Sequence, residues 1–376
     1  MIAPDSRLFR IRARLARRLG LLAAAGLAVV AAFAFVLAAL ALFALFRAGA
    51  ALAAGDWLGA LPWGAFAAFA SLCAARILIL LHAPLPLPDG IRLPRRAAPD
   101  FYRLTDDISR RIGAARVERV WITGDMNALV MQRPRWGWIG PIETHLLIGL
   151  PLVHSVSRHQ LAAVLAHEYA HLAIQRNGAG AVGALLRAWW MRVLDRACAA
   201  FPVVERFSDR LLLRFYRDMV RLSRLEEFEA DALAARLVGA GLLGETLVEV
   251  TLKEQFLRQD YWPKVMAQSN SRPRPSIRPY REMGLGVETG FLRPGSVSQP
   301  ALPADTQDGA MLHPTLQQRL RALRVPPCAA RVDRPSAASH YFAPLLPSLA
   351  WVFDRAWWRE TRKGWRRQYR GAARRR

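Results

Sequence analysis

The chain has 376 residues, 53% of them hydrophobic, which is enough for membrane segments plus one or two domains with real cores. This composition excludes a disordered chain, and the three cysteines lie too far apart for a disulfide framework or a cysteine metal site. The formal net charge of +24 would suggest nucleic acid, but much of it lies at residues 1–20 and 355–376. We therefore expect anionic lipid headgroups as partners and no nucleic acid.

Two long apolar runs open the chain. Residues 19–46 contain no charge, and this exceeds the roughly 20 residues that a bilayer core requires. A cleaved signal peptide is the alternative, but its apolar region is usually only about 7–15 residues long. Residues 57–82 are long enough to cross back. Arginines flank the outer ends of both runs, so we predict that residues 1–90 form a basic segment and a transmembrane hairpin with both ends cytoplasmic.

A soluble domain is predicted from residue 91 to residue 330. It begins with an amphipathic helix near 100–112, followed by strand-like runs at 117–123, 128–131 and 145–150, with a turn at 133–137. A small sheet therefore precedes the next helix. One of its strands could pair with an extended peptide, although the pattern does not tell which strand lies at the edge.

The helix predicted at 161–174 contains His167, Glu168 and His171 in an H-E-x-x-H arrangement. On a 3.6-residue period both histidines lie on one face, where they can bind a single zinc ion, and Glu168 lies beside them as a candidate general base. A capping-box pattern, Ser157 with Gln160, begins the helix, and Asn177-Gly178 is a stop signal. A surface helix with two histidines is the alternative.

Residues 181–222 read as helices that rest against the bilayer or the catalytic core, since charges interrupt them; a further membrane hairpin is the alternative. The following segment, 223–231, places Glu227 and Asp231 one turn apart on a helix face. Glu227 would complete a His-His-Glu zinc site with one open position, and Asp231 would orient one of the histidines. The alternative is a solvated acidic surface.

These segments resemble the HtpX-type and CAAX-prenyl-protease-type membrane zinc metallopeptidases, a gluzincin family. HEYAH at 167–171 and SRLEEFEAD at 223–231 carry the resemblance, together with Asn127-Ala128 and with His313-Pro314 followed by Arg319. The resemblance implies one zinc ion per chain held by His167, His171 and Glu227, Glu168 as general base, and Asp231 behind the ligands. It also implies a substrate-binding strand at Asn127 and Ala128, and contacts of His313 and Arg319 with the substrate or the oxyanion.

The sequence departs from the family pattern at two places. Gln132 stands where a glycine usually follows the Asn-Ala strand, and residues 181–222 carry more charge than the apolar pair of spans in HtpX-like members. Two further segments remain. Residues 264–310, rich in serine, proline and arginine, predict a mobile loop. Residues 331–376 predict a basic, tryptophan-rich helix on a membrane surface, or one whose first half packs on the catalytic domain.

The expected fold is mainly α with a small β-sheet: an α+β, zincin-like catalytic domain plus an N-terminal transmembrane hairpin. The expected function is that of an integral-membrane zinc endopeptidase in the cell (inner) membrane, with a cytoplasmic catalytic domain that cleaves membrane or membrane-proximal polypeptides. A catalytically silent membrane scaffold that binds partners is the alternative. A nucleic-acid-binding membrane protein is a third hypothesis, which rests only on the arginine content.

Overall fold

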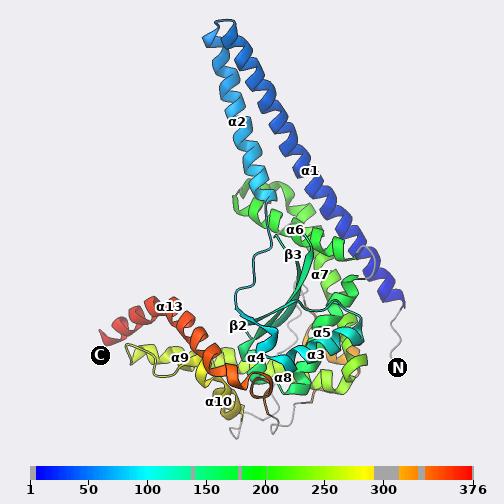
Figure 1. The fold of residues 1–376 in the computed structure, drawn as a ribbon, viewed down its shortest axis with the longest axis vertical. Helices are drawn as coiled ribbons and strands as arrows, with labels where there is room; N and C mark the ends of the chain where they lie inside the picture. The colour runs from blue at the N-terminus through cyan, green and yellow to red at the C-terminus, as the bar shows by residue number, and fades with distance from the viewer. Residues whose placement is uncertain are drawn as a thin grey trace.

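The computed structural model describes residues 6–136, 140–176, 180–200, 202–291, 313–328 and 335–374. Its described part is mostly helical, with one four-stranded mixed sheet and two long apolar helices at the N-terminus (Figure 1), which confirms the predicted fold class. The larger helices and the strands are α1 (Ser6–Ala53), α2 (Trp57–Leu81), β1 (Ile91–Leu93), α3 (Pro99–Ile112), β2 (Arg119–Thr123), β3 (Ala128–Pro134), β4 (Ile142–Gly149), α4 (Leu150–Ser155), α5 (Arg158–Arg176), α6 (Gly180–Ala200), α7 (Pro202–Val238), α8 (Ala240–Phe256), α9 (Trp262–Ala267), α10 (Pro279–Phe291), α11 (Leu316–Leu323), α12 (Ala337–Tyr341) and α13 (Leu346–Ala373).

The two apolar helices form a hairpin that projects away from the rest of the molecule (Figure 1). Asp56 begins α2 by accepting a hydrogen bond from the Gly59 backbone N–H at 2.8 Å. Small residues, among them Ala44 and Ala67, lie buried along the hairpin, whereas large apolar side chains such as Leu58, 81% exposed, point outward. Both helices are long and apolar enough to cross a membrane, and an apolar surface of this kind suits lipid better than water.

The N-terminal part of α1 docks on helices α6 and α7. Its 48 residues span about 72 Å at 1.5 Å per residue, more than twice a bilayer core of about 30 Å. Leu19 is fully buried against α6 and α7, and the ion pair of Arg12 with Glu229 of α7 has an Nε–Oε2 distance of 2.8 Å. Part of the basic charge that we assigned to lipid therefore pairs with protein carboxylates.

Replacement of Arg12 with alanine should destabilise the fold by about 3 kcal/mol, because it leaves the Glu229 carboxylate without its partner in a mostly buried site. Arg14 supplies the matched control, since it lies on the same helix and its side chain is exposed. Thermal unfolding of the purified proteins in detergent would measure the difference. Equal melting temperatures for Arg12→Ala and Arg14→Ala would contradict a structural role for this ion pair.

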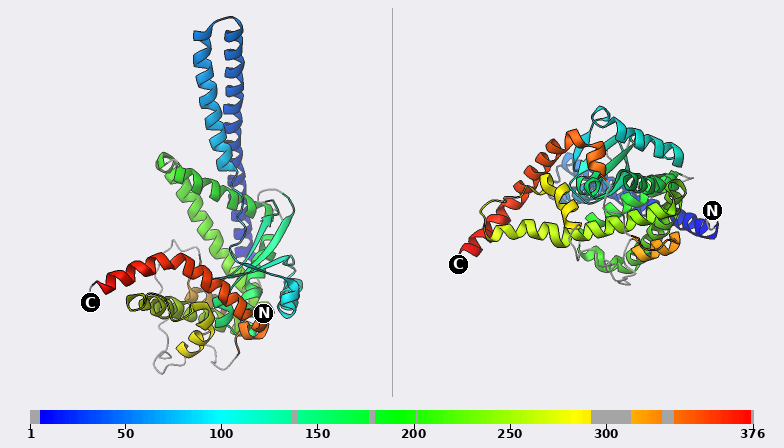
Figure 2. Two further views of the ribbon diagram at one scale, coloured as in Figure 1. Left: turned by 60° about the vertical axis from the view of Figure 1, so that its left-hand side comes forward. Right: turned by 90° about the horizontal axis from the view of Figure 1, so that it is seen from below.

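The sheet has the strand order β1-β2-β4-β3, so β3 forms one edge of the sheet and β1 forms the other. β2 and β4 are parallel, whereas β3 pairs with β4 in the antiparallel sense, with Leu129 opposite Leu147. The predicted strand at 128–131 is longer than expected and extends to Pro134, so the turn begins later than predicted. The C-terminal end of β3 and the N-terminal end of β4 point toward the hairpin end of the molecule (Figures 1 and 2).

Helix α5 crosses the domain core and packs against β3, α3, α7 and α8. Leu161, Leu165 and Tyr169 are fully buried there, so one face of the helix is fixed by packing. Its predicted stop at Asn177-Gly178 lies outside the described residues. The acidic segment 223–231 is not a separate helix but the C-terminal half of the 37-residue helix α7.

Residues 181–222 belong to α6 and the first half of α7, which pack against α1. Side chains of α6 donate hydrogen bonds to carbonyls at the C-terminal end of α2: Trp189 Nε1 to Leu81 O at 2.9 Å, and Arg192 Nε to Ala83 O at 3.1 Å. These bonds satisfy acceptors that a helix end leaves unpaired. Several charges and tryptophans of this region thus hold the base of the hairpin.

The predicted loop at 264–310 is wrong for two helical parts of its described residues, whereas residues 271–278 form no helix or strand. Residues 264–267 end α9, and 279–291 form α10, in which Met283 and Val287 are buried one turn apart against Tyr261 and Val265. This apolar i, i+4 pair stabilises helix despite the surrounding prolines and arginines. Residues 292–310 lie outside the described part of the chain.

The C-terminal helix α13 packs on the catalytic domain over more than its first half. Trp365 is fully buried, and its Nε1 donates a hydrogen bond to the carbonyl of Arg272 at 3.0 Å. The helix lies far from the tip of the apolar hairpin (Figure 1). The membrane-surface interpretation of this helix is therefore wrong for Trp365, because the protein itself covers this aromatic side chain.

Candidate metal centre

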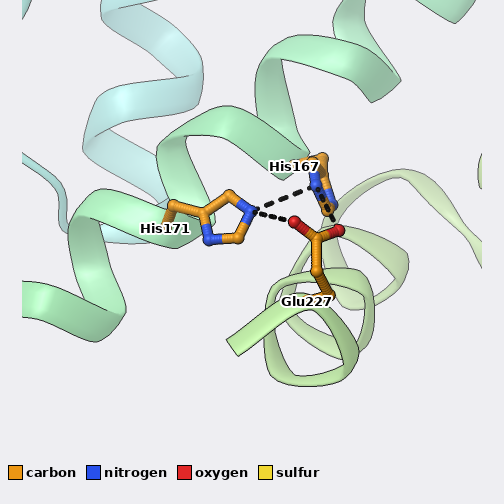
Figure 3. Close-up of side chains that lie close together, drawn as sticks. All are labelled: His167, His171 and Glu227. Carbon is orange, nitrogen blue, oxygen red and sulfur yellow. Dashed lines mark hydrogen bonds and ion pairs between the residues drawn. The ribbon is translucent and has the colours of Figure 1, made fainter. Parts of the chain in front are cut away.

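Three metal-ligating side chains converge where α5 crosses α7. His167 and His171 lie one turn apart on α5, and Glu227 approaches from α7 (Figure 3). The two Nε2 atoms are 3.2 Å apart, and the Glu227 oxygens lie 3.5 Å from His167 Nε2 and 3.4 Å from His171 Nε2. The structure thus brings together the three residues that the sequence predicts as ligands.

These separations fit a zinc ion. Zinc bonds of about 2.0–2.2 Å at tetrahedral angles place neighbouring ligand atoms roughly 3.3–3.6 Å apart. The two imidazole nitrogens, 3.2 Å apart, are close to this spacing, and each lies 3.4–3.5 Å from a different oxygen of Glu227. Two imidazoles and one carboxylate are also a ligand set that zinc enzymes use, with a fourth position left for water. The donor atoms are therefore arranged to hold one zinc ion.

Asp231 lies one turn after Glu227 on α7 and contacts the other side of His167. Its Oδ1 is 3.0 Å from His167 Nδ1, which leaves Nε2 directed at the ligand cluster. Burial alone would lower the pKa of His167, but hydrogen bonds to the Asp231 and Glu227 carboxylates raise its pKa to about 9. Asp231 therefore orients His167. The sequence alone did not indicate which of the two histidines Asp231 contacts.

Arg319 lies beneath the ligands and does not extend toward an open substrate site. Its Nε and one terminal nitrogen donate to the two Asp231 oxygens at 2.8 and 2.6 Å, and its other terminal nitrogen is 3.5 Å from Glu227 Oε2. These contacts use both ends of the guanidinium. Arg319 thus contacts the carboxylates that hold the ligands in place, and its expected contact with the substrate or the oxyanion stays a prediction.

His313 lies beside Glu227 and is open to solvent. Its Nδ1 is 2.9 Å from Glu227 Oε1, and its side chain is 69% exposed. The hydrogen bond to Glu227 raises the pKa of His313 against the opposing effect of burial. Of the two residues in the second predicted motif, His313 is the one that a bound substrate can reach.

Glu168 links the ligand helix to the sheet. Its Oε2 accepts a hydrogen bond from the backbone N–H of Val130 on β3 at 3.3 Å. Gly149 N donates to Asn127 O at 2.8 Å, so alternate residues of β3 from Asn127 onward face β4, and Ala128, Val130 and Gln132 present their backbone groups to the free edge. The candidate base and the free edge of the sheet therefore adjoin each other.

Two parts of the site escaped the sequence reasoning. Val130 acts through its backbone N–H, which no side-chain motif can reveal. Helix α11, which carries Arg319, begins with a capping box in which Thr315 and Gln318 exchange hydrogen bonds, and Gln318 also accepts one from Arg224 at 2.6 Å. The Thr-x-x-Gln pattern was a visible signal for this helix start.

Residues 143–326 match the model of peptidase family M48, which confirms the predicted resemblance for this part of the chain. A domain of this family, with the His167, His171 and Glu227 cluster inside it, implies a zinc metalloendopeptidase. Asn127 and Ala128 precede the matched region. Searches of curated proteins and of solved structures give no match.

Proposed function

We propose that the peptidase family M48 domain at 143–326 belongs to an integral-membrane zinc endopeptidase that cleaves membrane or membrane-proximal polypeptides. The observation that supports this proposal most is the position of Glu168. It lies next to both histidine ligands on α5 and within hydrogen-bond distance of the free edge strand β3. A peptide held along that edge would place its backbone beside the base and the metal ligands together.

In the proposed mechanism, zinc bound by His167, His171 and Glu227 would polarise the scissile carbonyl and acidify a water molecule. Glu168 takes the proton from this water as it attacks, and returns the proton to the leaving amine. His313, exposed beside Glu227, donates a hydrogen bond to the oxygen on which negative charge develops. Asp231 and Arg319 act on the ligands and hold them in position for this reaction.

The substrate backbone would pair with the free edge of β3 near Asn127 and Ala128. Ala128 and Gln132 offer backbone groups that β4 does not use. Val130 offers its carbonyl, because its N–H donates a hydrogen bond to Glu168. Main-chain pairing of this kind tolerates many side chains. Gln132, the departure from the family pattern, would then lie at one end of the paired segment, where its side chain could influence which residues are accepted.

The apolar hairpin supports the membrane part of the proposal. We infer that α1 and α2 cross the cell (inner) membrane as a hairpin with cytoplasmic ends, and that Arg76, exposed near the C-terminal end of α2, contacts anionic headgroups. The adjoining ends of β3 and β4 point toward the same end of the molecule (Figure 2), and Trp136 and Ile142, at these strand ends, are exposed. A polypeptide that leaves the bilayer would meet this end of the edge strand first.

Comparative proteomics of membranes tests this proposal. Cells that contain the Glu168→Gln variant should accumulate membrane polypeptides that disappear, or appear as shorter fragments, in cells that contain the wild-type chain. The matched control is Glu288→Gln, an exposed carboxylate on α10, which should behave as wild type. Identical membrane proteomes for wild type and Glu168→Gln would instead favour the silent scaffold.

A further inference from the structure

A cavity of about 600 Å³ lies between α10 and α13, outside the metal site. The two helices are in contact and lie side by side in Figure 1. Aromatic side chains, including Tyr280, Trp351 and Trp357, form much of its wall. A volume of this size, lined by aromatic groups with a few polar ones, is typical of ligand pockets. We call it the cationic cavity, for the charges described next.

Four arginines line the cationic cavity, and none forms an ion pair with the residues that the structure describes. They are Arg274, Arg278, Arg281 and Arg355. One carboxylate opposes them, that of Asp354, and it accepts a hydrogen bond from the Tyr280 backbone N–H at 2.8 Å at the start of α10. His154 adds no charge at neutral pH, because burial lowers its pKa to about 4. The cavity is thus aromatic and strongly positive.

A second, smaller cavity of about 420 Å³ adjoins the residues that precede the edge strand β3 and shares part of its wall with the cationic cavity. Tyr280 and Trp357 line both cavities, and the Tyr280 hydroxyl donates to the Gly124 carbonyl at 3.2 Å. Gly124, Asp125 and Met126 line the smaller cavity and directly precede Asn127. The charged side chains that line this smaller cavity are two carboxylates, Asp125 and Glu254, and one guanidinium, Arg258. The two cavities are therefore neighbours: one adjoins the N-terminal end of β3, and the other is lined by the four arginines.

The direction of β3 decides which part of a substrate would lie toward these cavities. β3 begins at Ala128, next to the smaller cavity, and ends at Pro134, toward the hairpin end of the molecule. A peptide that pairs with β3 in the antiparallel sense runs the other way, so the residues after its scissile bond extend toward the cavities. Its N-terminal side then lies toward the membrane hairpin.

We propose that the cationic cavity is a remote substrate subsite that takes an acidic segment with apolar residues, on the C-terminal side of the scissile bond. This inference rests on the proposed endopeptidase function. The four guanidinium groups, which form no ion pair within the described part of the chain, supply the complementary charge, and the aromatic wall accepts the apolar side chains between the acidic ones. Because the contact is remote from the reacting atoms, it contributes to binding more than to the chemical step.

The test is a cleavage profile of the zinc-loaded, full-length protein on a mixed library of peptides about 25 residues long, with all cut sites mapped by mass spectrometry. Cut sites of the wild type should be enriched in Asp and Glu several residues after the scissile bond. No acidic enrichment, or enrichment only before the scissile bond, would overturn the inference while leaving proteolysis intact. No cut at all would overturn the proposed function, and the inference with it.

A charge-reversal pair gives the matched comparison. Arg278→Glu/Arg281→Glu should raise KM for an acidic-tailed peptide roughly fivefold or more and leave kcat unchanged, since exposed charge pairs contribute up to about 1 kcal/mol each. The control Arg359→Glu/Arg362→Glu changes the same charge on α13 outside the cavity lining. Equal KM values for both double variants would show that the acidic segment is bound by general surface charge and not by the cationic cavity.

Discussion

Glu168→Gln should remove proteolysis almost completely while the protein keeps its zinc. The glutamine amide oxygen can still accept the hydrogen bond from Val130 N, so the contact between α5 and β3 is preserved, but the side chain no longer takes a proton from water. A positioned general base contributes on the order of 10³-fold to rate, and its loss appears in the chemical step.

The measurement is the initial rate at which an unfolded reporter polypeptide is cut by the zinc-loaded protein in detergent, with zinc content determined on the same sample. Glu288→Gln, which removes an exposed carboxylate from α10, is the control for loss of one negative charge. A zinc-containing Glu168→Gln protein that cleaves at the wild-type rate would show that another group acts as the base.

Glu227→Gln should lose both zinc and activity. Asp231→Asn should still bind zinc, but with lower affinity than the wild type. Glu227 supplies the only charged ligand among the three, and its oxygens lie 3.4–3.5 Å from both ligand nitrogens. Asp231 contacts His167 from behind, so its replacement leaves all three ligands in place but weakens their orientation. Groups in such positions typically affect metal affinity by about 10–100-fold.

Competition titration against a chromophoric zinc chelator measures both affinities. We expect the zinc affinity to be highest for the wild type and lower for Asp231→Asn, and we expect Glu227→Gln to have no measurable zinc site. Far-ultraviolet circular dichroism of each variant checks that the helices remain. If folded Glu227→Gln bound zinc as tightly as the wild type, the assignment of the third ligand to α7 would be wrong.

The spacing of the candidate ligands obeys helix geometry, but the complete ligand set followed from the family resemblance. His167 and His171 lie one turn apart, and Glu227 with Asp231 repeats that spacing on a second helix, so each pair shares a face without any knowledge of the tertiary fold. The hairpin was equally visible, since long uncharged runs exceed a bilayer core. Helix spacing and the length of an uncharged run are both local properties of the sequence, so both features could be recognised without the tertiary fold.

Features that depend on contacts between distant segments could not be predicted. The free edge of the sheet is set by the strand order, and nothing in residues 128–134 alone shows that β4 covers only one side. Arg319 follows its motif as expected, but only the fold shows that Asp231 engages two of its three guanidinium nitrogens. Similarly, the burial of Trp365 depends on its contact with the irregular segment around Arg272, which lies far from α13 in the sequence.

Zinc content of the purified full-length chain tests the central claim most directly. Elemental analysis after purification without added metal should give one zinc ion per chain, and treatment with a chelator followed by zinc should restore both the metal and proteolysis. A folded chain that retains no stoichiometric zinc and recovers none on addition would contradict the metallopeptidase account and favour a membrane scaffold.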